Sequence, residues 1–196
     1  MEDINFFDFK RLNKTKPSRG KALISEPFLD DNYFKRSVVY LCDYSENNTF
    51  GFVLNNYTDV KLNQLNLGLP DMETNISIGG PVDTNSLFYI HTLGNLLPNS
   101  RHVKNSIFVG GDFDTLKKLL LDEKINNNQI RFFLGYSGCG EHQLDDEIKK
   151  NAWIVTQIDE PDVMNAHEKN LWKSILKKKG DKYSVMADFP EDPALN

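Results

Sequence analysis

The chain has 196 residues, of which 39% are hydrophobic and 26% are charged, and its formal net charge is −5. This length suits one hydrophobic core and is short for two, so we expect a single domain over residues 1–196. No apolar run approaches the about 20 residues of a membrane-spanning helix, which argues against a membrane protein. The acidic amino terminus lacks an apolar signal segment, and two cysteines make no disulfide framework. We therefore expect a cytoplasmic protein.

The first residues differ from the rest of the chain. Residues 1–19 read as an aromatic segment that predicts a short helix at 4–12, followed by a polar connector. Beyond them, β-branched and aromatic runs between turn residues predict eight strands. The strands are expected near residues 21–25, 37–43, 49–55, 76–79, 86–91, 107–110, 130–135 and 152–157.

Helical periodicity begins only after the sixth of these strands. Apolar side chains recur at helical spacing after Asp112, which stands where an N-cap belongs, and they predict a helix over 113–123. Similar patterns predict helices near 141–150 and 166–179, the second of which ends at Gly180. Many strands followed by strand–helix alternation indicate an α+β fold, with a mixed, mostly antiparallel sheet and about three to four helices.

Seven of the twelve glycines fall in three segments that each follow an apolar strand. Glycine permits a positive φ or close approach of two backbones, and backbone N–H groups beside strand ends can hold an anion. We therefore hypothesise one shared surface that binds a protein partner or a small anionic ligand. Its candidate residues are Gly79, Gly80, Pro81, Gly110, Gly111, Asp112, Ser137, Gly138 and Gly140, with Asn55 as a polar neighbour. The alternative is that each glycine serves only its own turn.

The motifs of known catalytic and cofactor sites do not occur in this sequence. No glycine segment matches the dinucleotide or P-loop pattern, and Ser137 lacks the flanking spacing of a hydrolase elbow. The four histidines and two cysteines show no metal-ligand spacing, so we predict no metal and no cofactor. Cys139 precedes a predicted helix, where a thiol can be activated, but the adjacent Glu141 opposes a thiolate. The acidic run 145–147 is typical of a solvated helix face.

Three classes of function stay open. A non-enzymatic regulatory or adaptor protein is favoured by the glycine segments and by the lack of a catalytic constellation. Direct nucleic-acid binding by a DNA-binding regulator is weakly supported, because the net charge is negative and strands separate the helices. The local basic runs at 10–21 and 173–182 are more typical of solvated surface. A hydrolase-type enzyme would use Ser137, Asp112 and His91.

Several motifs, in this order along the chain, resemble the AlgH/YqgE family. They are Ser25-Glu26-Pro27-Phe28-Leu29-Asp30-Asp31, Phe34 to Val39, Gly51 to Asn55, Ile78 to Val82, Gly110 to Phe113, Arg131 to Gly138 and Glu191 to Asn196. The resemblance runs from about Gly20 to Asn196. It implies a bacterial α+β protein of a family often labelled transcriptional regulators, with unsettled molecular function and no established catalytic residue to carry over. Where such proteins usually carry Trp, this chain has Cys139, which argues against a shared catalytic thiol.

Overall fold

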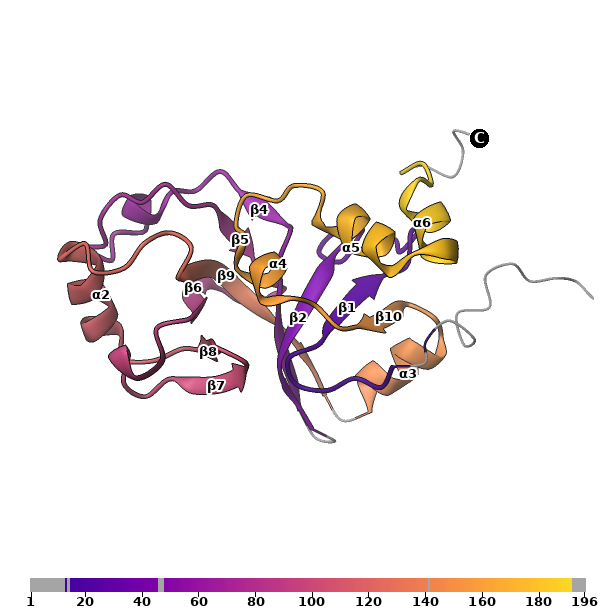
Figure 1. Cartoon of the computed structure of the whole chain (residues 1–196), viewed down its shortest axis with the longest axis horizontal. Helices are drawn as coiled ribbons and strands as arrows, with labels where there is room; N and C mark the ends of the chain where they lie inside the picture. The colour runs from indigo at the N-terminus through magenta and orange to yellow at the C-terminus, as the bar shows by residue number, and fades with distance from the viewer. Residues whose placement is uncertain (1–12, 14, 46–47, 141, 192–196) are drawn as a thin grey trace, which may run out of the picture.

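A sheet that is almost entirely antiparallel runs through the molecule (Figure 1). This computed structural model describes residues 13, 15–45, 48–140 and 142–191, so the helix expected at 4–12 lies outside the described residues. The ten strands of the described chain are β1 (Ala22–Ser25), β2 (Val38–Tyr44), β3 (Thr49–Val53), β4 (Tyr57–Thr58), β5 (Ile76–Ile78), β6 (Val82–His91), β7 (Arg101–Lys104), β8 (Ile107–Val109), β9 (Ile130–Cys139) and β10 (Trp153–Thr156).

Five α-helices and two short 3-10 helices complete the part of the chain that the structure describes. They are α2 (Phe113–Leu121), α3 (Gln143–Lys149), α4 (Glu160–Met164), α5 (Leu171–Lys179) and α6 (Asp181–Ala187), with η1 at Leu62–Leu65 and η2 at Gly94–Leu96. No helix within these described ranges has the length and apolar character of a membrane span.

The strand order is β10-β1-β2-β3-β9-β6-β8-β7, and β5 is the one strand that pairs in parallel, with β9. The α+β fold with a mixed, mostly antiparallel sheet is thereby confirmed. The ten-residue strand β9 joins two parts of the sheet, because it pairs first with β6 and then, over its last three residues, with β3. The change of partner falls between Tyr136 and Ser137. It follows a register shift in the β6 pairing at Gly135, whose φ of +69° and close approach to the carbonyl oxygen of Gly80 require glycine.

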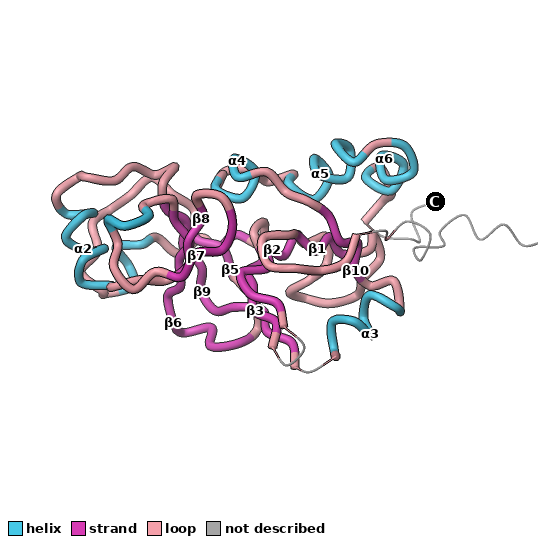
Figure 2. Tube along the Cα trace, turned by 60° about the horizontal axis from the view of Figure 1, so that its bottom comes forward, coloured by secondary structure: helices cyan, strands magenta, loops and turns pink. Residues whose placement is uncertain are grey.

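Alternation along the strands gives the sheet two apolar faces. Ile24, Tyr40 and Phe52 lie on one face, in the main core with α5. Leu23 and Val39 lie on the other face, where α3 is the one helix among the described residues that covers the sheet (Figures 1 and 2). A third apolar cluster packs α2 against the far end of β6 and β9. The lightly covered face holds the candidate site.

All eight expected strands are present, with shifted ends, and the helix expected at 113–123 is confirmed as α2. Asp112 is its N-cap and accepts the N–H of Thr115 at 2.8 Å. The helix expected at 141–150 is present as α3 over Gln143–Lys149. It begins late because its N-cap, His142, is left-handed, with a φ of +58°.

Two boundaries predicted from the sequence were wrong. The strand expected at 130–135 continues to Cys139, because pairing with β3 outweighs the glycines that predicted a loop. The helix expected at 166–179 begins at Leu171, because Asn165 and Glu168 accept N–H groups of nearby residues and hold turns there instead. The short elements β4, β7, α4 and α6 were not expected at all.

Candidate functional site

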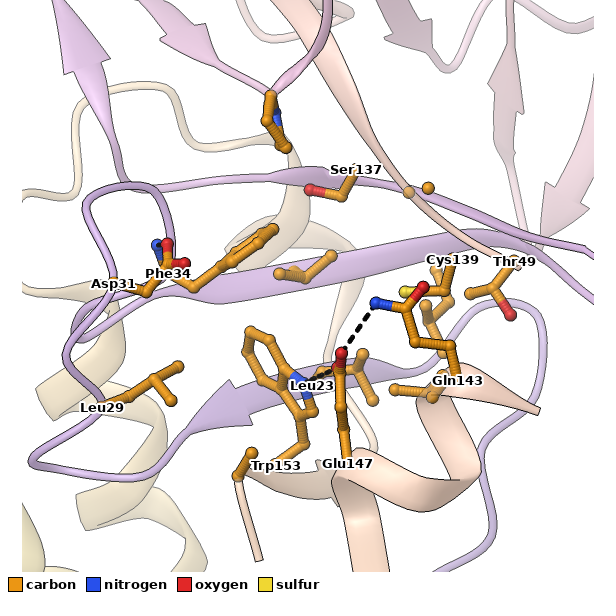
Figure 3. A pocket seen from close by; sticks show the side chains of 17 residues that line it. Leu23, Leu29, Asp31, Phe34, Thr49, Ser137, Cys139, Gln143, Glu147 and Trp153 are labelled. Atoms are coloured by element: carbon orange, nitrogen blue, oxygen red, sulfur yellow. Dashed lines mark hydrogen bonds between the residues drawn. The ribbon is translucent and has the colours of Figure 1, made fainter. Parts of the chain in front are cut away.

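A half-open cavity of about 350 Å³, which we call the α3 cavity, lies between α3 and the lightly covered face of the sheet (Figure 3). This volume falls at the lower end of the range for small-molecule sites. The cavity is lined by Leu23, Leu29, Asp31, Phe34, Val39, Leu41, Thr49, Gly51, Pro81, Ser137, Gly138, Cys139, Gln143, Leu144, Glu147, Ala152 and Trp153.

The hollow exists because side-chain size changes across the sheet. Leu23 and Leu41 on β1 and β2 are large and buried, whereas β3 and β9 present Gly51 and Ser137 to the same space. Gly51 has no alternative, since a Cβ there would lie 2.4 Å from the carbonyl oxygen of Tyr40. The small residues leave the space between α3 and this half of the sheet unfilled.

Glu147 organises the polar side of the cavity. Its carboxylate accepts the indole N–H of Trp153 at 2.8 Å and the amide N–H of Gln143 at 2.9 Å (Figure 3). Trp153 also meets Phe34 edge to face, with ring centroids 5.4 Å apart. On the other wall, Asp31 accepts the N–H groups of Tyr33 and Phe34 at 2.8 and 3.0 Å, which fixes the turn that carries Phe34.

The structure brings together two of the three predicted glycine segments. Ser137 Oγ donates to the carbonyl oxygen of Gly79 at 2.9 Å, and Gly80 packs against the backbone of Tyr136. Pro81, Ser137 and Gly138 line the α3 cavity together. Gly140 follows at its edge, where its N–H points to Gln143 Oε1 at 3.4 Å, but it does not line the cavity. Ser137 and Gly138 lie on strand β9 rather than on the expected loop.

The third segment and Asn55 lie elsewhere. Gly110 accepts from the ring of His91, and Gly111 accepts the hydroxyl of Tyr89 at 2.8 Å, at the start of α2. Asn55 accepts the N–H of Val38 and donates to the carbonyl oxygen of Arg36, both at 2.8 Å, so it anchors the start of β2. Gly110, Gly111 and Asn55 are therefore not among the residues that line the α3 cavity.

The residues proposed for a hydrolase are also separated. Ile130 pairs with His91, and Ser137 lies seven residues further along β9. At about 3.3 Å per residue this places them roughly 20 Å apart. Asp112 is engaged as the N-cap of α2. In the part of the chain that the structure describes, no group of three or more histidine, cysteine, aspartate or glutamate side chains could hold a metal ion.

His91 is a fully buried structural residue. Its Nδ1 accepts the N–H of Leu93 at 3.2 Å, so the proton sits on Nε2, which donates to the carbonyl oxygen of Gly110 at 2.9 Å. Ser100 Oγ lies 3.0 Å from Nε2 but donates to Leu97 at 2.6 Å. Because Nε2 is a donor, it cannot take a proton from Ser100, and the pair is not a nucleophile with its base.

Stability should depend on His91 below neutral pH. Burial lowers the pKa of His91, partly offset by its hydrogen bond to Gly110, so the unfolded chain, with a pKa of about 6.5, binds this proton more readily. The stability that the neutral His91 ring contributes is fully present above pH 6.5. It is lost as the pH falls toward the folded pKa, by up to about 1.4 kcal/mol per pH unit. Urea unfolding at several pH values measures this. Between the folded pKa and pH 6.5, the free energy of unfolding of His91→Gln should rise less steeply with pH than that of wild type. His102→Gln, which changes an exposed ring, is the control. Equal slopes for wild type and His91→Gln would contradict this assignment.

Cys139 is a partly buried thiol at the edge of the α3 cavity, and both cysteines are free thiols. Burial, and to a smaller degree the carboxylate of Glu147, raise the pKa of Cys139 to about 11. Burial also raises the pKa of Cys42, which lies in the main core. Neither thiol is therefore activated at neutral pH.

Alkylation should report this directly. At pH 8 the thiolate fraction of a group with a pKa of about 11 is roughly 100-fold below that of an ordinary cysteine. Iodoacetamide should accordingly modify Cys139 about 100-fold more slowly than free cysteine, with a rate that still rises from pH 9 to 10. Cys139→Ser leaves only Cys42 and so measures any background from unfolding. A fast reaction that levels off near pH 7 would instead identify an activated thiol.

The sequence did not predict a structural role for Arg131, which joins three elements in the main core. Its fully buried guanidinium donates to the carbonyl oxygens of Leu54 and, at 2.6 Å, of Val163, and approaches the Tyr57 hydroxyl at 3.4 Å. Burial lowers the pKa of Arg131 to about 10, so it stays charged at neutral pH. Arg131 ties β9 to the end of β3 and to α4 on the face opposite the α3 cavity. Its position within an aromatic strand was the available signal.

Two solved structures share this fold. Protein DIP2367 from Corynebacterium diphtheriae superposes with a TM-score of 0.74 at 21% identity, over 92% of this chain and 97% of that one. The AlgH protein from Pseudomonas aeruginosa superposes with a TM-score of 0.71 at 21% identity, over 90% and 97% of the two chains. Both comparisons define the class as an α+β protein with the AlgH fold.

Sequence comparison places the chain more closely. The profile of the AlgH-like family matches residues 22–184. A UPF0301 protein of Cytophaga hutchinsonii is 39% identical over 180 residues, which span 91% of this chain and 99% of that protein. A UPF0301 protein of Bacteroides fragilis is 42% identical over 196 residues, which span 99% and 100% of the two chains. The chain belongs to the AlgH-like family, which confirms the resemblance found in its motifs. The names of these relatives state no activity.

Proposed function

We propose that this chain is a non-enzymatic regulatory or adaptor protein that binds a partner through the α3 cavity. The observation that carries the proposal is the cavity itself, an apolar hollow edged by a few convergent polar groups. Small residues of two sequence segments, at Pro81 and at Ser137 and Gly138, form one side of its rim. The two free thiols suit action in a reducing compartment such as the cytoplasm.

The chemistry of the cavity favours binding over catalysis. The hydroxyl of Ser137 donates to the Gly79 carbonyl oxygen and has no base beside it among the described residues, and the Cys139 thiol is protonated at neutral pH. Of the side chains described around the cavity, two are carboxylates and none is basic. An anionic ligand, expected from the glycine segments, would therefore meet like charge here, and we propose a protein partner instead.

A filled cavity tests the proposal. Immobilised wild-type protein and Cys139→Trp would be exposed to extract of a bacterial host, with Leu96→Trp as the matched control, because Leu96 is exposed, lies outside the α3 cavity and belongs to η2. We expect a partner that wild type and Leu96→Trp retain and that folded Cys139→Trp loses. Equal retention by all three proteins would contradict a role for the cavity.

Direct DNA binding is the competing hypothesis. In the described basic run, Lys173 and Lys177 lie 3.5 and 3.3 Å from Asp188, and Lys178 lies 2.7 Å from Asp162. These acids reduce the positive potential that a phosphate backbone would need. A gel-shift titration over a salt series separates the two hypotheses, since nanomolar binding with a steep salt dependence would favour a DNA-binding regulator over an adaptor.

A further inference from the structure

We propose that the α3 cavity receives a lysine side chain of the partner protein. This inference rests on the proposed binding function and names the chemistry that the cavity recognises. Three features carry it: uncompensated negative charge, aromatic walls beside that charge, and an apolar floor.

Among the residues that the structure describes, none supplies a counter-ion to the negative charge of the cavity. Glu147 receives its hydrogen bonds from the neutral groups of Trp153 and Gln143, and Asp31 receives its bonds from two backbone N–H groups. The described residues that line the cavity include no lysine, arginine or histidine, and no ion pair in that part of the chain involves either carboxylate. Burial, and to a smaller degree the Glu147 charge, raise the pKa of the neighbouring Cys139.

The walls suit an alkylammonium group. The indole of Trp153 stands beside Glu147, and the ring of Phe34 packs against Trp153 (Figure 3). Cations are attracted both to aromatic rings and to carboxylates. Leu23, Val39 and Leu144 form apolar surface below them, against which four methylene groups can pack. A lysine side chain combines this apolar stem with a compact positive end.

Three small probes separate charge from apolarity. n-Butylammonium copies the lysine side chain, n-butanol keeps the stem without charge, and n-butyrate reverses the charge. The chain contains two tryptophans, so the two indole N–H signals of the 15N-labelled protein give a reporter and an internal control. Trp153 lines the cavity, whereas the Trp172 indole donates to the carbonyl oxygen of Ser25 in the main core.

We expect n-butylammonium to move the Trp153 signal, with an affinity at least 10-fold above that of n-butanol. n-Butyrate should bind more weakly than n-butanol. The Trp172 signal should stay in place with all three probes. Glu147→Gln keeps an acceptor for Trp153 and should lower n-butylammonium affinity about 10-fold without changing that of n-butanol. Asp146→Asn removes an exposed charge from the same helix, outside the cavity lining, and should leave all three affinities unchanged.

Several results would overturn the inference. The inference fails if n-butyrate binds as tightly as n-butylammonium, or if Glu147→Gln leaves the n-butylammonium affinity unchanged. It also fails if no probe moves the Trp153 signal. A Trp153 signal that shifts with protein concentration alone would assign the cavity to a second copy of the chain and would also overturn it. The capture experiment with Cys139→Trp fails or succeeds independently. A cavity-dependent partner without n-butylammonium binding rejects the lysine inference and leaves the proposed function standing.

Discussion

Replacing Arg131 with alanine is expected to lower the free energy of unfolding by about 3–5 kcal/mol. The change removes the guanidinium donors to the carbonyl oxygens of Leu54 and Val163, of which Leu54 keeps the hydroxyl of Ser77, and it leaves a cavity beside Phe133. Relief from burying a charge offsets only part of this loss. Urea unfolding, followed by circular dichroism, measures the change.

Arg101→Ala is the matched control for Arg131→Ala. Arg101 lies 2.7 Å from Asp43, but its side chain is 50% exposed, so its loss should cost about 0–1 kcal/mol. A cost below about 1 kcal/mol for Arg131→Ala as well would show that the buried guanidinium does not hold β9, β3 and α4 together.

Gly80→Ala is expected to lower the free energy of unfolding by about 3 kcal/mol or more. Gly80 has a φ of +152°, which side chains rarely allow, and a Cβ there would lie 2.4 Å from the carbonyl carbon and oxygen of Tyr136. The contact occurs where the chain after β5 crosses β9, so neither backbone can move without disturbing the sheet. Thermal unfolding of the purified variant tests this.

Gly140→Ala provides the comparison for Gly80→Ala. Nothing lies within 4 Å of a Cβ at Gly140, and its φ is not positive, so the change should stay within about 0.5 kcal/mol. Similar costs at the two positions would mean that close backbone approach is not what requires glycine at Gly80.

Local patterns predicted the elements whose residues decide their own conformation. The β-branched run Val38-Val39 gave β2, and Asp112 ahead of a helical apolar stripe gave α2. The end of β9 could not be predicted in this way. Gly135 and Gly138 read as a loop because their strand conformation depends on strands that are distant in the sequence. The residues beside Gly135 pair with β6, and Gly138 pairs with β3, more than 80 residues earlier in the chain.

The same distinction holds for the site. Pro81, Ser137 and Gly138 were identified from their glycine segments, but Glu147 was assigned to a solvated helix face. Glu147 follows Leu144 by three residues, a spacing that puts it beside the inward stripe of α3. This spacing alone could not place Glu147 in the site, because its role depends on the hydrogen bond from Trp153. Trp153 lies on the edge strand β10, and no local sequence pattern predicts that β10 and α3 come together. The segment at Gly110 and Gly111 has the same glycine-rich composition, but it does not line the α3 cavity.

Amide hydrogen exchange of the protein with and without its captured partner tests the central claim most directly. If the α3 cavity is the binding site, exchange should slow at residues 137–139 and in α3, and should stay unchanged at 94–113, which include β7 and β8 at the far end of the sheet. Protection confined to the segment around Gly110 and Gly111, with α3 unaffected, would contradict the assignment of the α3 cavity as the functional site.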